Sequence, residues 1–445
     1  MNLPSDFNER MKKMLGDEYD AFIDAFCRDE NHTALRINTM KDKNSAVRKH
    51  FGLTENVPWC ESGFYADKSV ISGNHPYHMA GLIYFQEPSA MAPAEALPIS
   101  EGDYILDLCA APGGKTTQAA ARLGGTGLMV SNEIVEKRAK ILAENVSRLG
   151  FKNVIITNES PSRLADKYEE FFDKVIVDAP CSGEGMFRKE KQAVECWSIE
   201  HTKSCGTRQK AIIDSALKCL APGGYLVYST CTFAIEENEA VAKYILENYP
   251  YIKIENPENL SMLSDGIGIA EAKRIYPHKH KGEGHFIALF HDTREKKPKD
   301  SVKTKSCKVK EYEEFEKEAL NIHLDGEIIE FGDNIYMKPA GINIDKIKTT
   351  LPGLHLGVRK KNRFEPSYNL SHALTGDEIK NTVNFSSDDI NIQKYLSGEC
   401  IECDKKGWTA VCVDGFPLGW GKASGGVLKN HFPKQLRLQS GGFTK

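Results

Sequence analysis

The chain has 445 residues, of which 40% are hydrophobic and 27% are charged, and its formal net charge is −4. This length is too great for one compact core, so we expect two to four domains of an ordinary soluble globular protein. No apolar run approaches the roughly 18 residues of a membrane span, and the slight negative charge argues against nonspecific coating of nucleic acid.

The first residues, MNLPSDFNERMKKMLGDEYD, are charged and lack the apolar stretch of a secretory signal, so we expect a cytoplasmic protein. We therefore expect the 12 cysteines to be reduced thiols rather than disulfides. Cys400 and Cys403 form a single CxxC pair without a second pair at zinc-finger spacing. We interpret them as ordinary thiols and expect no metal site.

The first part of the chain shows local patterns of both helix and strand. Helical spacing of apolar residues is present at 7–15 and 18–26, and residues 34–40 (ALRINTM) have the pattern of a short strand. Residues 82–97 (LIYFQEPSAMAPAEAL) predict a helix with Pro88 near its start.

From residue 103 the pattern changes to apolar runs that alternate with amphipathic segments. The predicted strands and the helices that follow them are 104–111 and 115–125, 127–134 and 136–150, 153–160 and 162–172, 173–180 and 207–220, and 224–232 and 236–249. Repeated strand–helix units build a parallel sheet covered by helices on both faces. Right-handed crossovers make this a doubly wound α/β sheet, with ligands at the carboxyl ends of its strands. We expect the domain to span residues 99–292.

A basic segment separates this domain from the rest of the chain. Residues 294–310 hold eight Lys or Arg and two acidic residues, and we interpret 293–312 as a solvated linker. Strand-like runs beyond it predict an α+β module over 313–385. Residues 386–445 predict a small β-rich module whose turns are marked by five glycines: Gly415, Gly419, Gly421, Gly425 and Gly426.

The segment DLCAAPGGKTTQAA, residues 107–120, follows the first strand of the sheet and opens a helix. Gly113 and Gly114 allow a tight turn, and the free N–H groups at the helix start can bind an anion or a carboxylate. The segment is not a P-loop, because Cys109 stands where that motif requires glycine. Glu133, at the end of the next strand, can accept both ribose hydroxyls of a nucleoside cofactor. S-adenosylmethionine fits this combination, because no redox or phosphotransfer motif is visible.

Two later strands each end at a cysteine. VIVDAPCSGEG places Cys181 after one strand, and YLVYSTCT places Cys231 after the next. Polar neighbours in each turn favour a reactive thiolate, so on these patterns alone the two cysteines are equal candidates for a nucleophile. We interpret four other cysteines as small buried hydrophobic residues: Cys109, Cys196, Cys205 and Cys219.

Three motifs in this order and at this spacing, DLCAAPGGKTTQAA, DAPCSGEGMFRK and YSTCTFAIEENE, resemble the NOL1/NOP2/Sun family of RNA 5-methylcytosine methyltransferases. Similarity to its RsmF branch, bacterial enzymes of 16S rRNA, extends to YFQEPSAM, IYPHKHKGEGHF, RFEPS and LKNHFPK. The resemblance implies an N-terminal RNA-binding domain over 1–98 and a Rossmann-like S-adenosylmethionine-dependent domain over 99–292. It also implies a PUA-like RNA-binding module over 386–445.

The resemblance further implies roles for particular residues. Glu133 would bind the cofactor's ribose, and the cofactor loop would consist of Cys109, Ala110, Ala111, Pro112, Gly113, Gly114 and Lys115. Many relatives hold the adenine with an aspartate after the third strand, where this chain has Ser160, with Asn158 and Glu159 as alternatives. Asp178 would lie between the methionine end of the cofactor and the target base and contact ring N3.

Lys115 would organise that contact. The resemblance assigns the nucleophile to Cys231 and gives Cys181 a part in product release, as acid or base during elimination. For two further pairs of polar residues the sequence leaves two roles open. Arg188 and Lys189 would bind an RNA phosphate or be solvated, and Arg36 and Asn38 would be structural or contact RNA.

We therefore predict a metal-independent enzyme that methylates carbon 5 of cytosine in RNA, with 16S rRNA, naked or within the 30S subunit, as its substrate. One alternative is a tRNA 5-methylcytosine methyltransferase, because the catalytic motifs are shared across the family. Another is a ribosome-assembly factor that binds rRNA without catalysis, against which the intact catalytic positions argue. A methyltransferase for proteins or small molecules has no use for paired cysteines at two strand ends.

Overall fold

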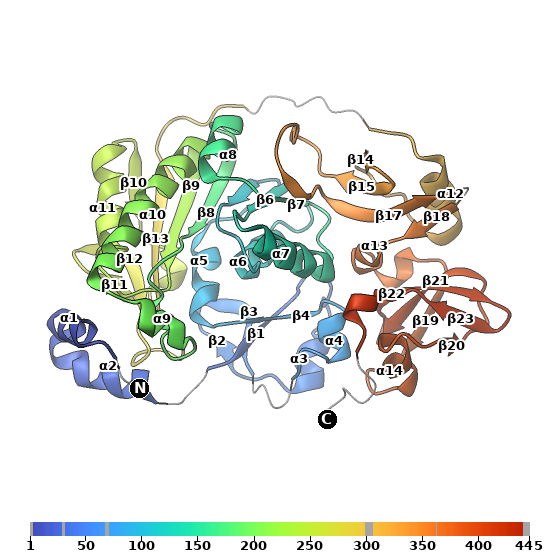
Figure 1. The fold of residues 1–445 in the computed structure, drawn as a ribbon, viewed down its shortest axis with the longest axis horizontal. Coiled ribbons are helices and arrows are strands. Elements are labelled where there is room, and N and C mark those ends of the chain that lie inside the picture. The colour runs from blue at the N-terminus through green and yellow to red at the C-terminus, as the bar shows by residue number, and fades with distance from the viewer. Residues whose placement is uncertain (1–2, 29–31, 67–70, 299–305, 362, 439–445) are drawn as a thin grey trace.

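The computed structural model describes residues 3–28, 32–66, 71–298, 306–361 and 363–438. Strands within these ranges form four sheets (Figure 1). Part of the predicted linker, residues 299–305, lies outside the described residues. No helix in the described part of the chain is long and apolar enough to cross a membrane.

The N-terminal part contains two helices and a small antiparallel sheet. Helices α1 (Ser5–Leu15) and α2 (Tyr19–Cys27), joined by the short helix η1 (Gly16–Glu18), confirm the predicted helical spacing. The sheet has the order β2-β3-β1-β4. Its strands are β1 (Ala34–Ile37), β2 (Asn56–Val57), β3 (Cys60–Tyr65) and β4 (Ile83–Gln86), and its connections contain α3 (Ala46–Phe51) and α4 (Pro76–Met79).

The helix predicted for residues 82–97 is wrong in its first part. Residues 83–86 form strand β4, because they pair antiparallel with β1, from Ala34 opposite Gln86 to Ile37 opposite Ile83. Helical structure begins only after Pro88, with the short helix η2 (Ser89–Met91) and helix α5 (Ala92–Ala96). Proline disfavours helical backbone at the residue before it, which separates the strand from the helix.

A ten-stranded sheet forms the largest domain. Its strands are β5 (Tyr104–Asp107), β6 (Leu128–Asn132), β7 (Val154–Thr157), β8 (Phe172–Asp178), β9 (Leu220–Thr230), β10 (Ile252–Glu255), β11 (Ser264–Gly266), β12 (Ile269–Ile275), β13 (His285–Asp292) and β16 (Thr349–Leu351). The order is β11-β12-β13-β9-β8-β5-β6-β7-β16, with β10 paired to β13. Strands β7, β6, β5, β8 and β9 are parallel, and β13 and β16 flank them in antiparallel orientation.

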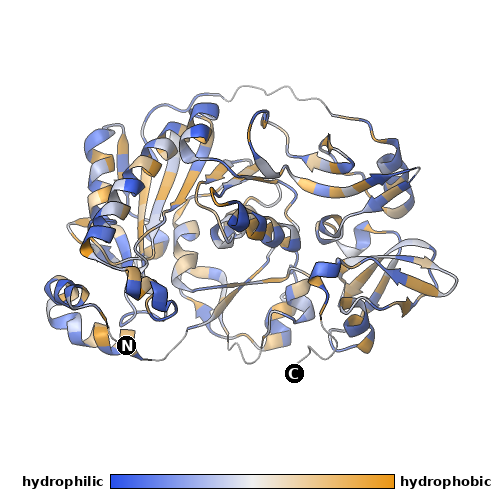
Figure 2. Ribbon diagram, in the orientation of Figure 1, coloured by the Kyte–Doolittle hydropathy of each residue, from blue (hydrophilic) through white to orange (hydrophobic). Residues whose placement is uncertain are grey.

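Helices cover both faces of this sheet, which confirms the predicted doubly wound α/β fold. The helices of this domain are α6 (Gly114–Arg122), α7 (Glu136–Leu149), α8 (Pro161–Lys167), α9 (Lys191–Cys196), α10 (Ile199–Cys219) and α11 (Glu239–Asn248), with the short helices η3 (Glu184–Met186) and η4 (Glu258–Leu260). Successive strand residues point to opposite faces, so Leu106 packs with α8, α10 and α11, whereas Ile105 packs with α6 and α7. The central strands are accordingly mostly hydrophobic, and the helices mix hydrophobic and hydrophilic residues (Figure 2).

The order of the strands determines where a ligand can bind. After β5 the chain adds β6 and β7 on one side and then returns to place β8 and β9 on the other. The loops after β5 and β8 therefore diverge at the carboxyl ends of two neighbouring strands, which is where open α/β sheets bind ligands. Helices α1 and α2 lie beside α9 and β11 of this domain, apart from the sheet that follows them in the sequence (Figure 1).

The C-terminal part contains two further sheets, and the second begins at residue 382, before the expected boundary at residue 386. The first comprises β14 (Glu327–Phe331), β15 (Asn334–Lys338), β17 (Leu354–Lys360) and β18 (Arg363–Pro366), with α12 (Lys310–Ala319) and α13 (Tyr368–His372). The second comprises β19 (Thr382–Phe385), β20 (Ile401–Glu402), β21 (Gly407–Val413), β22 (Phe416–Ser424) and β23 (Val427–Asn430), with α14 (Ile390–Leu396), η5 (Gly376–Glu378) and η6 (Lys434–Leu436).

Three of the five glycines predicted to mark turns do so. Gly415, Gly425 and Gly426 adopt positive φ angles of 87°, 62° and 80° between strands. The prediction is wrong for Gly419 and Gly421, which lie within β22. A Cβ at Gly419 would lie 2.4 Å from the hydroxyl of Tyr395 in α14, so glycine is required there for the helix to pack closely on the sheet.

Candidate active site

A cavity of about 900 Å³ lies at the carboxyl ends of the parallel strands. Its walls come from the loops after β5, β6 and β8 and from residues of α9 and α10. Six of the residues that the sequence assigns to the site line it: Cys109, Ala111, Glu133, Asp178, Cys181 and Cys231. The tertiary structure thus brings both strand-ending cysteines into one space with the predicted cofactor loop.

Cys181 and Cys231 follow the adjacent parallel strands β8 and β9, and their sulfur atoms lie 3.2 Å apart. The contact with Cys231 raises the pKa of Cys181 well above the ordinary thiol value, and burial and the Glu237 carboxylate add to the rise. Cys181 therefore keeps its proton, contrary to the expectation of a thiolate at this position. Its thiol can donate a hydrogen bond to the Cys231 sulfur.

The twelve cysteines are all free thiols. Cys205 and Cys219 are buried as predicted, and Cys109 is partly exposed. The prediction is wrong for Cys196, which is exposed and lines the cavity because the short helix α9 buries none of its residues. Among the described residues, no group of three or more His, Cys, Asp or Glu side chains could hold a metal ion.

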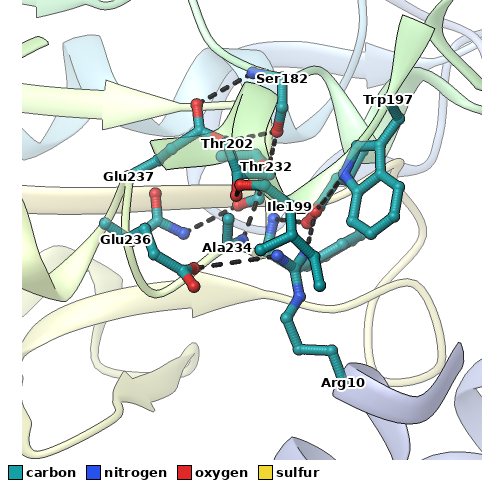
Figure 3. A network of polar contacts seen from close by, with 12 residues as sticks. Arg10, Ser182, Trp197, Ile199, Thr202, Thr232, Ala234, Glu236 and Glu237 are labelled. Atoms are coloured by element: carbon teal, nitrogen blue, oxygen red, sulfur yellow. Dashed lines mark hydrogen bonds and ion pairs between the residues drawn. The ribbon is translucent and has the colours of Figure 1, made fainter. Parts of the chain in front are cut away.

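Hydrogen bonds connect the turns that carry the two cysteines. The Gly185 N–H donates to the Cys231 carbonyl at 2.9 Å, and the hydroxyl oxygens of Ser182 and Thr232 lie 2.9 Å apart. Behind them the buried Glu237 carboxylate accepts a hydrogen bond from the Ser182 N–H at 2.9 Å (Figure 3). Burial raises the pKa of Glu237. The relative position of the two sulfurs thus depends on polar contacts as well as on the strand ends.

Asp178, the last residue of β8, is contacted by three side chains. The Lys115 ammonium donates to Oδ2 at 2.7 Å, the Ser229 hydroxyl donates to Oδ1 at 2.8 Å, and His285 Nε2 lies 3.4 Å from Oδ1. Burial alone would raise the pKa of Asp178, but Lys115 and His285 hold it well below its usual range. Burial lowers the pKa of Lys115, and Asp178 outweighs this and raises it. Asp178 is therefore a carboxylate that accepts hydrogen bonds.

The loop after β5 turns into helix α6 as the sequence predicts. Gly113 has a φ of 112°, and α6 begins at Gly114, so the free N–H groups of its first turn lie next to the end of β5. A Cβ at Gly114 would lie 3.1 Å from the Gln86 amide of β4, so the N-terminal sheet packs against this loop. Beneath the loop, burial raises the pKa of Asp107 to about 7, and its carboxylate accepts a hydrogen bond from Thr116.

Glu133 follows β6 and is buried. Its Oε1 accepts a hydrogen bond from the Val135 N–H at 2.9 Å, and its Oε2 lies 3.1 Å from the Arg138 guanidinium. Each carboxylate oxygen has a second lone pair, so both can still accept from a ligand hydroxyl. The position at a strand end and the remaining acceptor capacity are what a ribose contact requires.

The three candidates for an adenine contact lie just outside the cavity wall. Asn158 donates to the carbonyls of Glu133 and Ile134, and Glu159 accepts from the Lys348 N–H. Ser160 caps the start of α8, and its neighbour Pro161 lines the cavity. Ser160 is thus the candidate that is nearest in sequence to the wall, and its contact with adenine stays a prediction.

Burial decides between the two roles, structural or in contact with RNA, that the sequence left open for Arg36 and Asn38. Arg36 is 2% exposed and donates to Gln86, to the Gly114 carbonyl and to Thr117. Asn38 is also 2% exposed, and its side-chain amide donates to two backbone carbonyls, at Gly81 and Leu149. Both residues are structural, and Arg36 connects the N-terminal sheet to the cofactor loop.

Arg188 is neither solvated nor available to a phosphate in this conformation, whereas Lys189 is exposed. The Arg188 side chain is 6% exposed, and its guanidinium pairs with Glu283 at 2.6 Å and donates to the Ala25 and Gly282 carbonyls. Lys189 lies 3.2 Å from the same Glu283 carboxylate. The buried Glu283, far along the chain, thus takes Arg188 out of solvent, and both expected roles of Lys189, solvated or bound to an RNA phosphate, stay open.

The sequence patterns did not identify four polar residues that lie at the site. Ser229 and His285 contact Asp178, and Glu184 and Glu237 are fully buried beside the cysteine turns. The quoted motifs contain all four, but acidic residues in a turn are ordinarily solvated, so their burial had no local signal. Ser229 could have been found, because it lies at the end of β9, two residues before Cys231.

Four family descriptions match successive parts of the chain. They are "16S rRNA methyltransferase RsmB/F" over residues 94–291, "N-terminal domain of 16S rRNA methyltransferase RsmF" over 3–88, "RsmF rRNA methyltransferase first C-terminal domain" over 314–374 and "Methyltransferase RsmF PUA domain" over 382–438. Together they account for most of the sequence.

Similar proteins match along nearly the whole length. The chain is 32% identical to ribosomal RNA small subunit methyltransferase F of Vibrio vulnificus, covering 98% of this chain and 97% of that one. It is 34% identical to the Shewanella oneidensis protein of the same name, covering 94% and 93%. The solved structure of NSun6 from Pyrococcus horikoshii with SFG has a TM-score of 0.58 at 25% identity, covering 66% and 99%. That of PH0851 has a TM-score of 0.59 at 26% identity, covering 65% and 66%.

Proposed function

This chain belongs to the 16S rRNA methyltransferase RsmB/F family, and on that premise we propose that it methylates carbon 5 of a cytosine in 16S rRNA through a Cys231 adduct. The observation that carries the proposal is the 3.2 Å separation of the Cys181 and Cys231 sulfurs in the cavity at the ends of β8 and β9. Two thiols in contact beside an ionised Asp178 suit a reaction in which one sulfur must add to the base and later leave it.

The reaction needs a nucleophile because carbon 5 of cytosine does not accept a methyl cation unaided. The Cys231 thiolate adds to carbon 6, the carbon 5–carbon 6 double bond opens, and its electron pair moves to carbon 5. Carbon 5 then bonds to the methyl group as the bond between that methyl and the donor's sulfonium sulfur breaks and leaves its electron pair on the sulfur. A base then removes the carbon 5 proton, the electrons of that bond restore the double bond, and the carbon 6–sulfur bond breaks to return the thiolate.

Cys181 acts in the last of these steps. Because its raised pKa keeps the proton on Cys181, we assign it the role of acid rather than base. A protonated thiol 3.2 Å away stabilises the Cys231 thiolate as it leaves carbon 6. Without this donor the thiolate is a poorer leaving group, and the methylated RNA stays bound to Cys231.

Asp178 and Lys115 orient the base and stabilise charge on its ring. An ionised Asp178 can accept a hydrogen bond from the exocyclic amino group of cytosine, next to ring N3. Addition of the thiolate places negative charge on the ring, and the Lys115 ammonium, 2.7 Å from Asp178, is the cation placed to stabilise it at N3.

The residues present fit S-adenosylmethionine. Glu133 has acceptor capacity for two ribose hydroxyls, and the ionised Asp178 attracts a cationic sulfonium. The loop residues 109–115 and the first turn of α6 would hold the methionine end, with Ser160 near the adenine. When bound, S-adenosylmethionine supplies the electrophilic methyl group.

The RNA partner follows from the family and from the cavity. A recessed site requires a cytosine in a single-stranded or opened region, or one that is flipped out. We expect the N-terminal sheet and the PUA-like module to hold the surrounding RNA, either naked 16S rRNA or an assembled 30S subunit in the cytoplasm. No metal takes part in the proposed steps.

Two cysteine variants test the mechanism. Cys231→Ala should abolish methyl transfer and form no adduct, whereas Cys181→Ala should trap substrate RNA as a covalent complex visible on a denaturing gel. Cys400→Ala, which removes an exposed thiol of the C-terminal module, is the control and should behave as wild type. An adduct in Cys231→Ala but not in Cys181→Ala would reverse the two assignments.

Bisulfite sequencing of RNA from a deletion strain tests the substrate. We expect one or more cytosines of 16S rRNA to lose their methylation and the tRNA signal to remain. Loss of tRNA methylation with intact 16S rRNA would instead identify a tRNA methyltransferase. If neither RNA loses methylation, the result would favour the alternative that the protein is a ribosome-assembly factor without catalysis.

A further inference from the structure

The first two helices pack against the turns that carry the catalytic cysteines. Their apolar faces form one aromatic cluster with the catalytic domain, made of Phe7, Met11, Phe22 and Phe26 from the helices and Phe187, Trp197, Phe233 and Tyr276 from the domain. Phe233 lies two residues after Cys231, and its ring centroid is 5.2 Å from that of Phe22. Helices α1 and α2 are therefore part of the wall behind the active site.

Glu184 connects the two cysteine turns from behind. It lies three residues after Cys181 and is completely buried. Its Oε2 accepts a hydrogen bond from the Phe233 N–H at 2.9 Å, and its Oε1 accepts one from Trp197 Nε1 at 2.8 Å. One carboxylate thus joins the Cys181 turn to the backbone that follows Cys231.

Arg10 of α1 supplies the positive charge that this carboxylate needs. Its guanidinium donates to Glu184 Oε1 and is placed over the Trp197 ring. It also lies 3.8 Å from Glu236 Oε2 (Figure 3). Only 18% of the Arg10 side chain is exposed. A buried carboxylate without a cation is costly, so the Glu184 contacts depend on Arg10.

We propose that Arg10 is a positioning residue for the two catalytic cysteines, acting through Glu184. In this assignment, which rests on the proposed function, α1 contributes to the geometry of the reaction rather than to RNA affinity. Loss of Arg10 leaves Glu184 buried without its cation, the Phe233 and Trp197 contacts loosen, and the two sulfurs lose their fixed separation. Displacing a reacting group by about 1 Å can cost on the order of 100-fold in rate.

The test uses the full chain with Arg10→Met, Glu184→Gln, both changes together, and Lys13→Met as the matched control. Lys13 is an exposed cation on the same helix. We would measure kcat and KM with 16S rRNA, and separately the rate at which iodoacetamide alkylates Cys231 without RNA, read by mass spectrometry of its peptide. The buried Cys412 of the C-terminal module reports global unfolding in the same spectra.

We expect Arg10→Met to lower kcat on the order of 100-fold at unchanged KM, with faster alkylation of Cys231 and unchanged protection of Cys412. Lys13→Met should match wild type. The kcat of the double variant should be about tenfold higher than that of Arg10→Met, because Glu184→Gln removes the buried charge that has lost its cation. A double variant worse than Arg10→Met would overturn the assignment.

Two further results would overturn it: unchanged Cys231 alkylation in Arg10→Met, or a raised KM at unchanged kcat, which would make Arg10 an RNA contact. Wild-type protein that does not methylate 16S rRNA would defeat the proposed function instead. The alkylation comparison needs no substrate, so faster alkylation of Cys231 in Arg10→Met would still support the positioning role.

Discussion

The Lys115→Met variant tests the electrostatics of the site most directly. Lys115 and Asp178 form an ion pair at 2.7 Å, with 10% and 32% of their side chains exposed. A neighbouring cation lowers a carboxyl pKa by roughly 1–3 units, and each unit corresponds to about 1.36 kcal/mol. Loss of the ammonium therefore destabilises the ionised form of Asp178 by about 1.4–4 kcal/mol. Met has a similar length and keeps the packing of the stem.

If the Lys115 ammonium stabilises the negative charge that develops on the cytosine ring, its loss destabilises the transition state by the same amount. The expected fall in kcat is then roughly 10- to 1000-fold, with little change in KM for RNA. Single-turnover methylation of 16S rRNA with labelled S-adenosylmethionine measures this step. Lys140→Met, which removes an exposed cation from α7, is the control and should leave the rate unchanged.

Two outcomes would refute the reasoning. One is a kcat within about threefold of wild type, because the cation would then contribute nothing specific to the transition state. The other is a loss confined to KM for S-adenosylmethionine, which would make Lys115 a cofactor-loop residue only. Asp178→Asn combined with Lys115→Met should lose less than the sum of the two single variants, because the residues act as a unit.

Three further predictions concern the turn, the cofactor and stability. Gly185→Ala should lower kcat on the order of tenfold or more, because a Cβ would lie 2.9 Å from the Cys231 carbonyl oxygen and displace the turn; wild-type kcat would contradict this. Glu133→Gln should weaken S-adenosylmethionine binding by roughly 10- to 100-fold in calorimetry, and unchanged affinity would remove Glu133 from the ribose site. Burial and Lys41 hold the pKa of His372 well below its usual value, so only the unfolded chain binds a proton as pH falls below about 6.5. The free energy of unfolding should therefore fall from pH 7 to 5, less so in His372→Gln, and equal urea midpoints in the wild type would contradict this.

Much of the central domain could be predicted because its signals are local. Alternating strands and helices, the glycines of the cofactor loop and the cysteines at two strand ends each occupy a short stretch of sequence. Parallel strands bring all their carboxyl ends to one edge of the sheet, so motifs that follow such strands meet without further information. This is why Glu133, Asp178, Cys181 and Cys231 line one cavity as expected.

The failures come from partners that lie far away in the sequence. Residues 83–86 have apolar character suited to a helix, but pairing with β1 makes them a strand. Arg188 was interpreted as solvated or bound to phosphate, and Glu283 takes it into a buried ion pair. Arg36 is likewise buried against the cofactor loop. In each case a tertiary contact outweighs a local preference.

By itself, the sequence determined the type of fold, the family and the residue types available for chemistry, because these depend on periodicity and on motifs of a few residues. Only the tertiary structure decided the protonation of those residues and the position of the first helices. The pKa of Asp178 and of Cys181 depends on charges and sulfurs about 3 Å away that come from other elements. Helix α1 reaches the cysteine turns only through contacts with residues far along the chain, such as Arg10 with Glu184.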